Sequence, residues 1–208
     1  MKLVFKIIIF VFLIFLGCYP VNESSVEYRF RIVESSKKYI GNVKINYGSK
    51  VYDFDCSGFV KFVFLDALGV DIDKKIPFFT TSKSLDYYNF LRMRGFVSFN
   101  NFSSGDLIFF NNTYDRNMNG KLDDPITHIG IVIGVDEITG SIVFVDKSKG
   151  KNVSIKFMNL NRKRERMVFV NGKMYEVNSY IRDDGKYKFL ASEVFAGFGD
   201  IRGFLVDR

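Results

Sequence analysis

The residue types best suited to covalent chemistry in this chain are a thiol and an imidazole, at Cys56 and His128. Cys56 follows Asp55 where a long apolar run begins, so we expect it in the first turn of a helix with Asp55 as N-cap. The positive end of the peptide dipoles there stabilises a thiolate, which is a nucleophile. A nucleophilic cysteine needs a base, and His128 is the one histidine of the chain. Alone, each residue is better explained as a packed core residue, and only the pair points to hydrolysis.

Two elements must hold this pair in place. The apolar run 59–68, followed by Gly69, predicts a buried helix that ends at the glycine. The β-branched run 127–134 predicts a strand on which His128 and Gly130 share one face. We expect the glycine to leave space beside the imidazole.

Three motifs occur in a recognisable order along the chain. They are Asp-Cys-Ser-Gly at residues 55–58, Gly-Asp-Leu-Ile-Phe-Phe at residues 105–110 and His-Ile-Gly-Ile at residues 128–131. Together they resemble the NlpC-type cell-wall peptidases, a papain-like family of cysteine hydrolases, over about residues 30–150. The resemblance implies an α+β, papain-like fold of the NlpC type, in which the nucleophile helix packs on an antiparallel β-sheet.

The resemblance also implies a reaction. The Cys56 thiolate would attack a carbonyl of a peptidoglycan stem peptide, at a bond joining D-glutamate to a diamino acid, with His128 as general acid and base. In this family a third polar residue, on the strand after the histidine strand, orients the imidazole. The matching position here holds Asp146, where His, Asn or Gln is commoner in the family. Lys147 or Ser148 takes that position if the register shifts by one or two residues.

Three further residues match family positions that contact the substrate. Tyr47, in a tyrosine-glycine turn, would lie over the active site and donate to the oxyanion, and the alternative is an aromatic on a surface turn. Asp55 and Ser57 would bind the amino end of a truncated stem peptide. The chemistry requires no cofactor.

Two other functions remain open on the same residues. One keeps the fold and the chemistry but cleaves another amide or a lipid ester, and the other is a non-catalytic lipoprotein that binds the cell wall. The pocket walls come from residues 70–99, which carry no signature that chooses between these functions. In that stretch Thr80, Thr81 and Ser82 predict only the cap of a helix over 83–94.

A polar loop precedes the histidine strand. The side-chain oxygens of Asp115, Asn117, Asn119 and Asp123 fall at positions 1, 3, 5 and 9 of a calcium-binding loop, and the carbonyl of Lys121 falls at position 7. Position 12 lacks the bidentate glutamate that such a loop needs. The pattern therefore predicts a partial, weak, structural Ca²⁺ site or, equally, a solvated polar turn.

The chain begins with a targeting pattern. In residues 1–17 two lysines precede an uncharged apolar run that is too short for a membrane span and suits a secretory signal. The run ends in Phe-Leu-Gly-Cys, a loose lipoprotein processing box in which Cys18 would be acylated, with an uncleaved or conventionally cleaved signal as the alternative. We expect an exported, membrane-anchored lipoprotein on the periplasmic or cell-envelope face, with residues 18–27 as tether and 28–208 as the hydrolase domain.

Composition and charge limit the classes of partner that the chain can have. The formal charge of +7 favours anionic partners such as cell-wall polymer or lipid headgroups. We find no nucleic-acid-binding motif in the sequence, and we expect a monomer whose partners are stem peptide and membrane. Once Cys18 is acylated, Cys56 would be the one free thiol, so no intramolecular disulfide is expected. With 47% hydrophobic residues, the chain can fill a sizeable core.

Strand signals continue beyond the resemblance. Residues 153–158 predict a strand, and residues 167–177 predict an added hairpin around an Asn-Gly turn. The basic cluster 162–166 before this hairpin predicts a solvated loop or, alternatively, a contact with glycan or lipid headgroups. Residues 195–199 and 202–206 predict the final strand and its approach.

Overall fold

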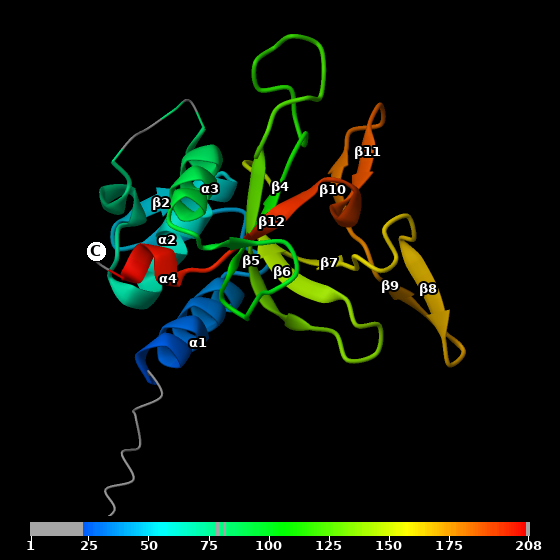
Figure 1. Ribbon diagram of the computed structural model, residues 1–208, viewed down its shortest axis with the longest axis horizontal. Helices are drawn as coiled ribbons and strands as arrows, with labels where there is room; N and C mark the ends of the chain where they lie inside the picture. Colours follow the sequence, from blue (N-terminus) through cyan, green and yellow to red (C-terminus); the bar gives the residue numbers. More distant parts are fainter. Residues whose placement is uncertain (1–22, 78–79, 81, 207–208) are drawn as a thin grey trace, which may run out of the picture.

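A six-stranded antiparallel sheet forms the centre of the computed structural model, which describes residues 23–77, 80 and 82–206. The α-helices lie on one side of this sheet and two small hairpins lie on the other (Figure 1). The α+β class with an antiparallel sheet is as predicted. Within the described ranges, no helix is both long and apolar enough to cross a membrane. The predicted signal segment and Cys18 fall outside these ranges.

The order of the elements along the chain differs from the order of the strands in the sheet. The elements are α1 (Glu23–Lys38), β1 (Ile45–Tyr47), β2 (Lys50–Tyr52), α2 (Cys56–Leu68), the 3₁₀ helix η1 (Ile72–Lys75), α3 (Lys83–Met93), β3 (Val97–Ser98), β4 (Leu107–Phe110), β5 (His128–Val135), β6 (Ile142–Asp146), β7 (Ser154–Met158), β8 (Met167–Val170), β9 (Lys173–Glu176), β10 (Tyr180–Asp183), β11 (Lys188–Leu190), the 3₁₀ helix η2 (Ala191–Glu193), β12 (Phe195–Gly199) and α4 (Arg202–Leu205). The main sheet runs β3-β12-β4-β5-β6-β7, and each neighbouring pair is antiparallel.

Helix α2 confirms the buried helix predicted after Asp55. The Asp55 side chain accepts a hydrogen bond from the Gly58 backbone N–H at 2.7 Å, and Gly69 ends the helix with left-handed backbone at φ 69°. The apolar side chains of α2 are packed in the main core between helices and sheet. This packing fixes the first turn, and Cys56 with it.

Helix α1 spans Glu23–Lys38, so the last residues of the predicted tether, 23–27, are helical. Arg29 ties the helix to the sheet, because its guanidinium donates to the Asp106 carboxylate at 2.5 Å. The preceding residue is Gly105, at φ 92°, and a Cβ at this position would lie 3.1 Å from the Arg29 backbone. The Gly-Asp-Leu motif thus docks α1 against the start of β4.

Helix α3 confirms the helix predicted for the otherwise uninformative stretch. Ser82 is its N-cap, and the Ser82 side chain accepts from the Leu85 N–H. Leu91 is fully buried, and Leu85 and Tyr88 are partly buried against the same core, as predicted. The helix therefore stands with its first turn beside that of α2, which matters for the site described below.

Strands β4, β5 and β6 bring the polar residues of the site to one end of the sheet. Strand β4 is buried along its whole length, as predicted for a strand covered on both faces. Gly130 on β5 pairs with Asp146 on β6, so His128, which shares a face with Gly130, meets Asp146 diagonally. The space expected beside Gly130 is filled, because a Cβ there would lie 2.9 Å from the Val145 carbonyl oxygen.

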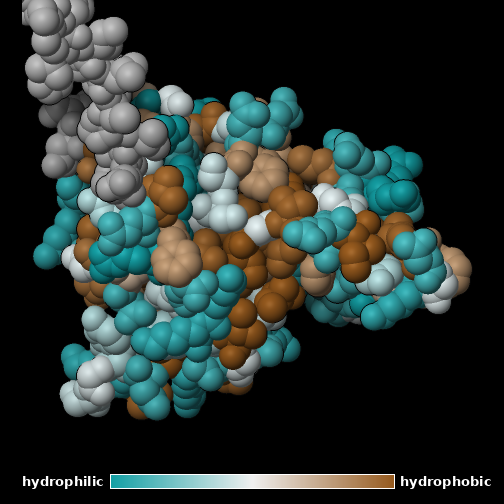
Figure 2. All heavy atoms as spheres, turned by 90° about the horizontal axis from the view of Figure 1, so that it is seen from below, coloured by the Kyte–Doolittle hydropathy of each residue, from teal (hydrophilic) through white to brown (hydrophobic). Residues whose placement is uncertain are grey.

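Strands β8 and β9 confirm the predicted hairpin, which forms a separate two-stranded sheet. The hairpin projects from the rest of the molecule and carries hydrophobic residues among hydrophilic ones (Figure 2). Phe169 and Met174 are exposed on it. In the preceding basic cluster, residues 162–166, Arg162 pairs with Glu165 and Arg166 pairs with Glu176.

The C-terminal part differs from the prediction in three ways. A second hairpin, β10–β11, carries no signal that we recognised. Strand β12 lies between β3 and β4, so residues 195–199 belong to the central sheet and extend the core well past residue 150. Residues 202–205 form the short helix α4 and not a strand, and the Asp200 side chain before it accepts from the Arg202 N–H at 2.9 Å.

Candidate active site

Cys56 is the first residue of α2, at the mouth of two cavities of about 560 and 280 Å³. Asp55 Oδ1 accepts from the Gly58 N–H at 2.7 Å and from the Ser57 hydroxyl at 3.0 Å, which closes the first turn. Gly58 suits this turn, since a Cβ there would lie 3.2 Å from the Asp55 carboxylate. The backbone N–H groups of Cys56 and Ser57 have no acceptor within the described residues and are free to bind a ligand.

His128 and Asp146 form a buried, hydrogen-bonded pair. His128 Nε2 lies 2.8 Å from Asp146 Oδ2, and the other carboxylate oxygen accepts from the Ser154 hydroxyl at 2.8 Å. His128 and Asp146 are only 7% and 3% exposed, so little water competes for these bonds. Because Nε2 is held by Asp146, the Nδ1 atom is the ring nitrogen left for Cys56.

The thiol and the imidazole are close enough to interact. Both side chains line the cavity of about 280 Å³. Burial alone would lower the pKa of His128, but the charge of a Cys56 thiolate and the Asp146 carboxylate outweigh it and raise the pKa to about 10. Burial acts to raise the pKa of Asp146, and the bond to His128 overcomes it and holds this pKa below its usual value. The raised pKa favours the protonated, imidazolium form of His128.

The raised pKa of His128 gives a measurable expectation. Its contribution to stability is fully present below the unfolded value of 6.5 and is lost as the pH rises through about 10. Because the chain has one histidine, its imidazole NMR signals report this site alone. We expect a titration midpoint near pH 10 in the native protein and a lower midpoint in Cys56→Ala, which lacks the thiolate. A native midpoint near 6.5 would contradict the imidazolium assignment.

Lys147 is fully buried behind the site, and the sequence suggested it only as a substitute for Asp146. Its ammonium donates to Asp53 Oδ1 and to the carbonyl oxygens of Phe54 and Ser148, each at 2.9 Å. Three acceptors match the three donors of an ammonium group. Lys147 therefore ties the end of β6 to the segment just before Asp55, which sets the position of the nucleophile helix relative to the imidazole.

Two side chains beside the thiol were missed by sequence reasoning. Tyr114 lines both cavities with Cys56, and the pKa of its hydroxyl is raised by burial first and by the charge of a Cys56 thiolate second. Ser84, buried in the first turn of α3, places Oγ 3.7 Å from Cys56 Sγ. The cap at Ser82 marked the start of α3, but no local pattern linked either residue to Cys56.

Tyr47 lies apart from the cavities that Cys56 lines. It is on the β1–β2 hairpin, 41% exposed, and its ring packs edge-on against Phe62 with centroids 5.1 Å apart. It is not among the described residues that line either cavity. A role for Tyr47 at the oxyanion stays a prediction, and Tyr114 is the tyrosine that lines both cavities with Cys56.

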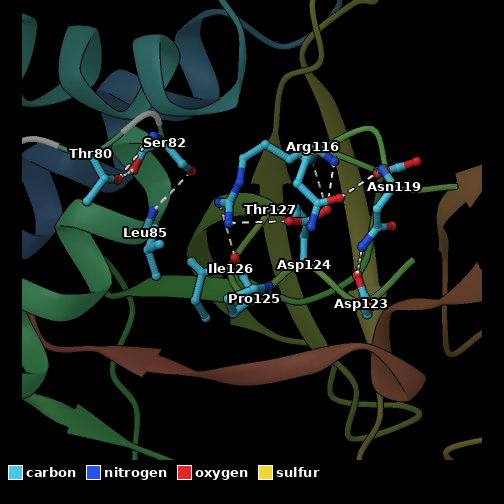
Figure 3. A network of polar contacts seen from close by, with 12 residues as sticks. Thr80, Ser82, Leu85, Arg116, Asn119, Asp123, Asp124, Pro125, Ile126 and Thr127 are labelled. Carbon is cyan, nitrogen blue, oxygen red and sulfur yellow. Dashed lines mark hydrogen bonds and ion pairs between the residues drawn. The ribbon is translucent and has the colours of Figure 1, made fainter. Parts of the chain in front are cut away.

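In the polar loop before β5, side-chain oxygens accept hydrogen bonds from donors of the same loop. Asp115 accepts from the N–H groups of Asn119 and Gly120, at 3.1 and 2.7 Å, and the Asn119 amide donates to Asp123 at 3.2 Å (Figure 3). Asn117 Oδ1 also accepts from the Asn119 N–H, at 3.0 Å. In the described part of the chain, no three Asp, Glu, His or Cys side chains are grouped so as to hold a metal.

The loop ends are fixed to the histidine strand. Thr127, next to His128, accepts from the Thr113 N–H and hydroxyl at 2.8 Å each. Asp124 is buried and accepts from the Arg116 N–H at 2.7 Å (Figure 3). Anything that orders the loop therefore also steadies the start of β5.

Calcium binding by Asp115, Asn117, Asn119, Asp123 and the Lys121 carbonyl stays a prediction. If it occurs, millimolar calcium raises the melting temperature and the hydrolysis rate together, with a dissociation constant of about 10⁻⁴ to 10⁻³ M. Asp115→Ala removes both responses, and magnesium at the same concentration is the control for ionic strength. If chelation changes neither quantity and calorimetry detects no heat of binding, the loop is a polar turn.

The fold brings together a thiol at a helix N-terminus, a buried imidazole on a neighbouring strand and a carboxylate that holds it, a set of groups suited to a hydrolase. The chain belongs to the NlpC/P60 family, whose sequence profile matches residues 42–171. The resemblance stated from the three motifs is thereby confirmed. Hairpin β10–β11 and strand β12 lie outside the matched segment.

A curated relative is the gamma-DL-glutamyl hydrolase of Bacillus subtilis (strain 168). It is 27% identical to this chain over 128 residues, which are 61% of this chain and 25% of the relative. The match thus spans about a quarter of the length of that protein.

Proposed function

We propose that the protein is a papain-like cysteine hydrolase that cleaves peptidoglycan stem peptides. The observation that carries the proposal is that Cys56, at the N-terminus of α2, lines one cavity with His128, whose Nε2 is held by Asp146. Membership of the NlpC/P60 family supports it. In this proposal Cys56 is the nucleophile, His128 is the general acid and base, and Asp146 is the carboxylate that orients the imidazole.

In the first half-reaction, Cys56 Sγ attacks the scissile carbonyl carbon and a C–S bond forms. The imidazolium of His128 gives its Nδ1 proton to the amide nitrogen, the C–N bond breaks, and the amine product leaves. Asp146 keeps the ring orientation through Nε2 and balances the imidazolium charge. The acyl half of the substrate remains on Cys56 as a thioester.

In the second half-reaction, neutral His128 takes a proton from water at Nδ1, and the hydroxide attacks the thioester carbonyl. The C–S bond breaks, the carboxylic acid product leaves, and the thiolate–imidazolium pair is restored. In both halves an oxyanion forms on the carbonyl oxygen. The unpaired N–H groups of Cys56 and Ser57, at the positive end of α2, are placed to receive it.

For the scissile bond we propose the one that joins D-glutamate to a diamino acid. The support is the relative whose name is gamma-DL-glutamyl hydrolase. The Asp55 side chain lines both cavities and binds its own turn through Oδ1 alone, so Oδ2 can accept an ammonium group from the amino end of the substrate. The Ser57 hydroxyl lies beside it.

The direct test is incubation of the purified protein with muropeptides of defined structure, followed by mass spectrometry of the products. The proposal requires two fragments whose masses place the cut after D-glutamate. A cut at another amide, or release of a fatty acid from lipid, would transfer the same chemistry to one of the alternative substrates. Binding to wall material without any product would favour the non-catalytic lipoprotein.

We also propose that the protein is exported and anchored through Cys18. Metabolic labelling with palmitate should tag the protein, and Cys18→Ser should remove the tag. Cys56→Ser is the matched control, because it removes the other cysteine and should leave the tag in place. A mature N-terminus mapped elsewhere than Cys18 would contradict the proposal.

A further inference from the structure

Strand β10 forms a second wall of the catalytic cleft, opposite the helices. Ile181 on β10 lines the cavity of about 280 Å³ that holds Cys56 and His128. Ile181 also lines an adjoining cavity of about 310 Å³, which extends from Ser148 along β7 and β10. The two cavities share Ser148 and Ile181, so we treat them as one trough that leads away from the thiol.

The wall is anchored at both of its sides. Arg182 on β10 donates to the Thr113 carbonyl at 2.7 Å, directly beside Tyr114. Lys156 on β7 donates to the Tyr180 carbonyl at 2.7 Å. Strand β10 lies beyond the segment that the family profile matches, so this wall is an addition of this chain to the shared core.

The trough is positively charged. Lys149 lines its inner part, and Lys151 lines its outer part. Both lysines are exposed, and neither has a carboxylate within salt-bridge distance among the described residues. Of the carboxylates that also line the trough, Asp146 holds His128 and Asp183 pairs with Lys188 at 3.3 Å, while Asp55 lies at the inner end beside Cys56.

The other side of the thiol has the opposite character. There the larger cavity is lined by Asp53 and Asp55, next to the first turns of α2 and α3. Asp53 already accepts a hydrogen bond from the Lys147 ammonium, so Asp55 is the acidic group left for a ligand. A substrate with an ammonium group at one end and a carboxylate at the other would therefore lie across Cys56 in one direction only.

We propose that the trough is the subsite for the leaving-group half of the substrate and that Lys149 and Lys151 recognise a carboxylate on it. The inference rests on the proposed function and extends it. The acyl half stays on Cys56 as the thioester, and the amine product departs through the trough with its carboxylate. A diamino acid or a following D-amino acid with a free carboxylate fits this description.

The test uses two peptide substrates of the purified full chain that differ only in the leaving-group half, which ends in a carboxylate or in the matching carboxamide. We expect the carboxylate peptide to have the higher kcat/KM, by about three- to tenfold and mainly through KM, because exposed ion pairs are individually weak. Lys149→Gln combined with Lys151→Gln should bring the ratio of the two values close to one. Lys163→Gln, an exposed lysine outside the trough, should keep the native ratio.

Direct binding separates failure of this inference from failure of the proposed function. The Cys56→Ala chain is titrated calorimetrically with the amine product in its carboxylate and carboxamide forms. Preference for the carboxylate, lost in the double lysine variant, supports the subsite even if no peptide is cleaved. Equal binding of both forms, or equal cleavage of both peptides by the native chain, overturns the inference and leaves the proposed function untouched.

Discussion

Cys56→Ala should abolish hydrolysis of stem peptides, by about 10⁴-fold or more, because no other group near His128 can form the thioester. His128→Ala should reduce the rate to the same background, since the two residues act as a unit and their losses do not add. The rate of peptide cleavage, followed by mass spectrometry at matched protein concentration, measures both effects.

The melting temperature of each variant is the control, because it shows whether the fold is intact. Cys56 is only partly buried and its thiol packs against Ser84, so the alanine variant should melt within a few degrees of the native protein. Ser84→Ala is a useful companion, because it removes the neighbouring hydroxyl and keeps the nucleophile. Hydrolysis by Cys56→Ala at the native rate would end the assignment of a cysteine hydrolase.

The second large effect is expected at Asp146. Asp146→Ala frees His128 Nε2 and leaves the Ser154 hydroxyl without its acceptor, so the ring can move. A misplacement of about 1 Å costs roughly a hundredfold in rate. The loss of charge also lowers the pKa of His128, so the imidazolium needed by the leaving amine is lost at a lower pH than in the native enzyme.

Asp146→Asn separates orientation from charge. The amide oxygen still accepts from Nε2, and only the negative charge is removed, which should cost roughly tenfold in rate. The alkaline limit of activity should shift downward in both variants, with the larger loss of rate in the alanine variant. If both variants retain the native rate and pH profile, Asp146 has no part in orienting the imidazole.

The residues of the site that are close in sequence to a clear pattern could be placed in advance. The cap at Asp55 and the apolar run behind it put Cys56 in a first helical turn. A short turn joins β5 to β6, so the register that brings Asp146 opposite Gly130 is local. Because these placements need no long-range information, the structure agrees with them.

Residues whose position depends on how distant elements pack could not be placed in this way. Tyr114 reaches the thiol only because its loop is fixed to the start of β5, and Ser84 only because α3 stands beside α2. The sequence offered Lys147 only as an alternative to Asp146, and its burial depends on contact between the end of β6 and the segment before α2. Strand β12 was predicted, but its place between β3 and β4 depends on a pairing with distant strands that no local pattern shows.

The position of β12 also determines when the central sheet can be completed. Residues 195–199 are made late, yet they lie between β3 and β4, so β4 has an open edge until they arrive. A chain that emerges from its N-terminus presents Cys56 and His128 long before that strand can pair, and such distant pairings form slowly. We therefore expect a chain cut before residue 195 to carry Cys56 and His128 on an incomplete sheet and to lack the proposed hydrolysis.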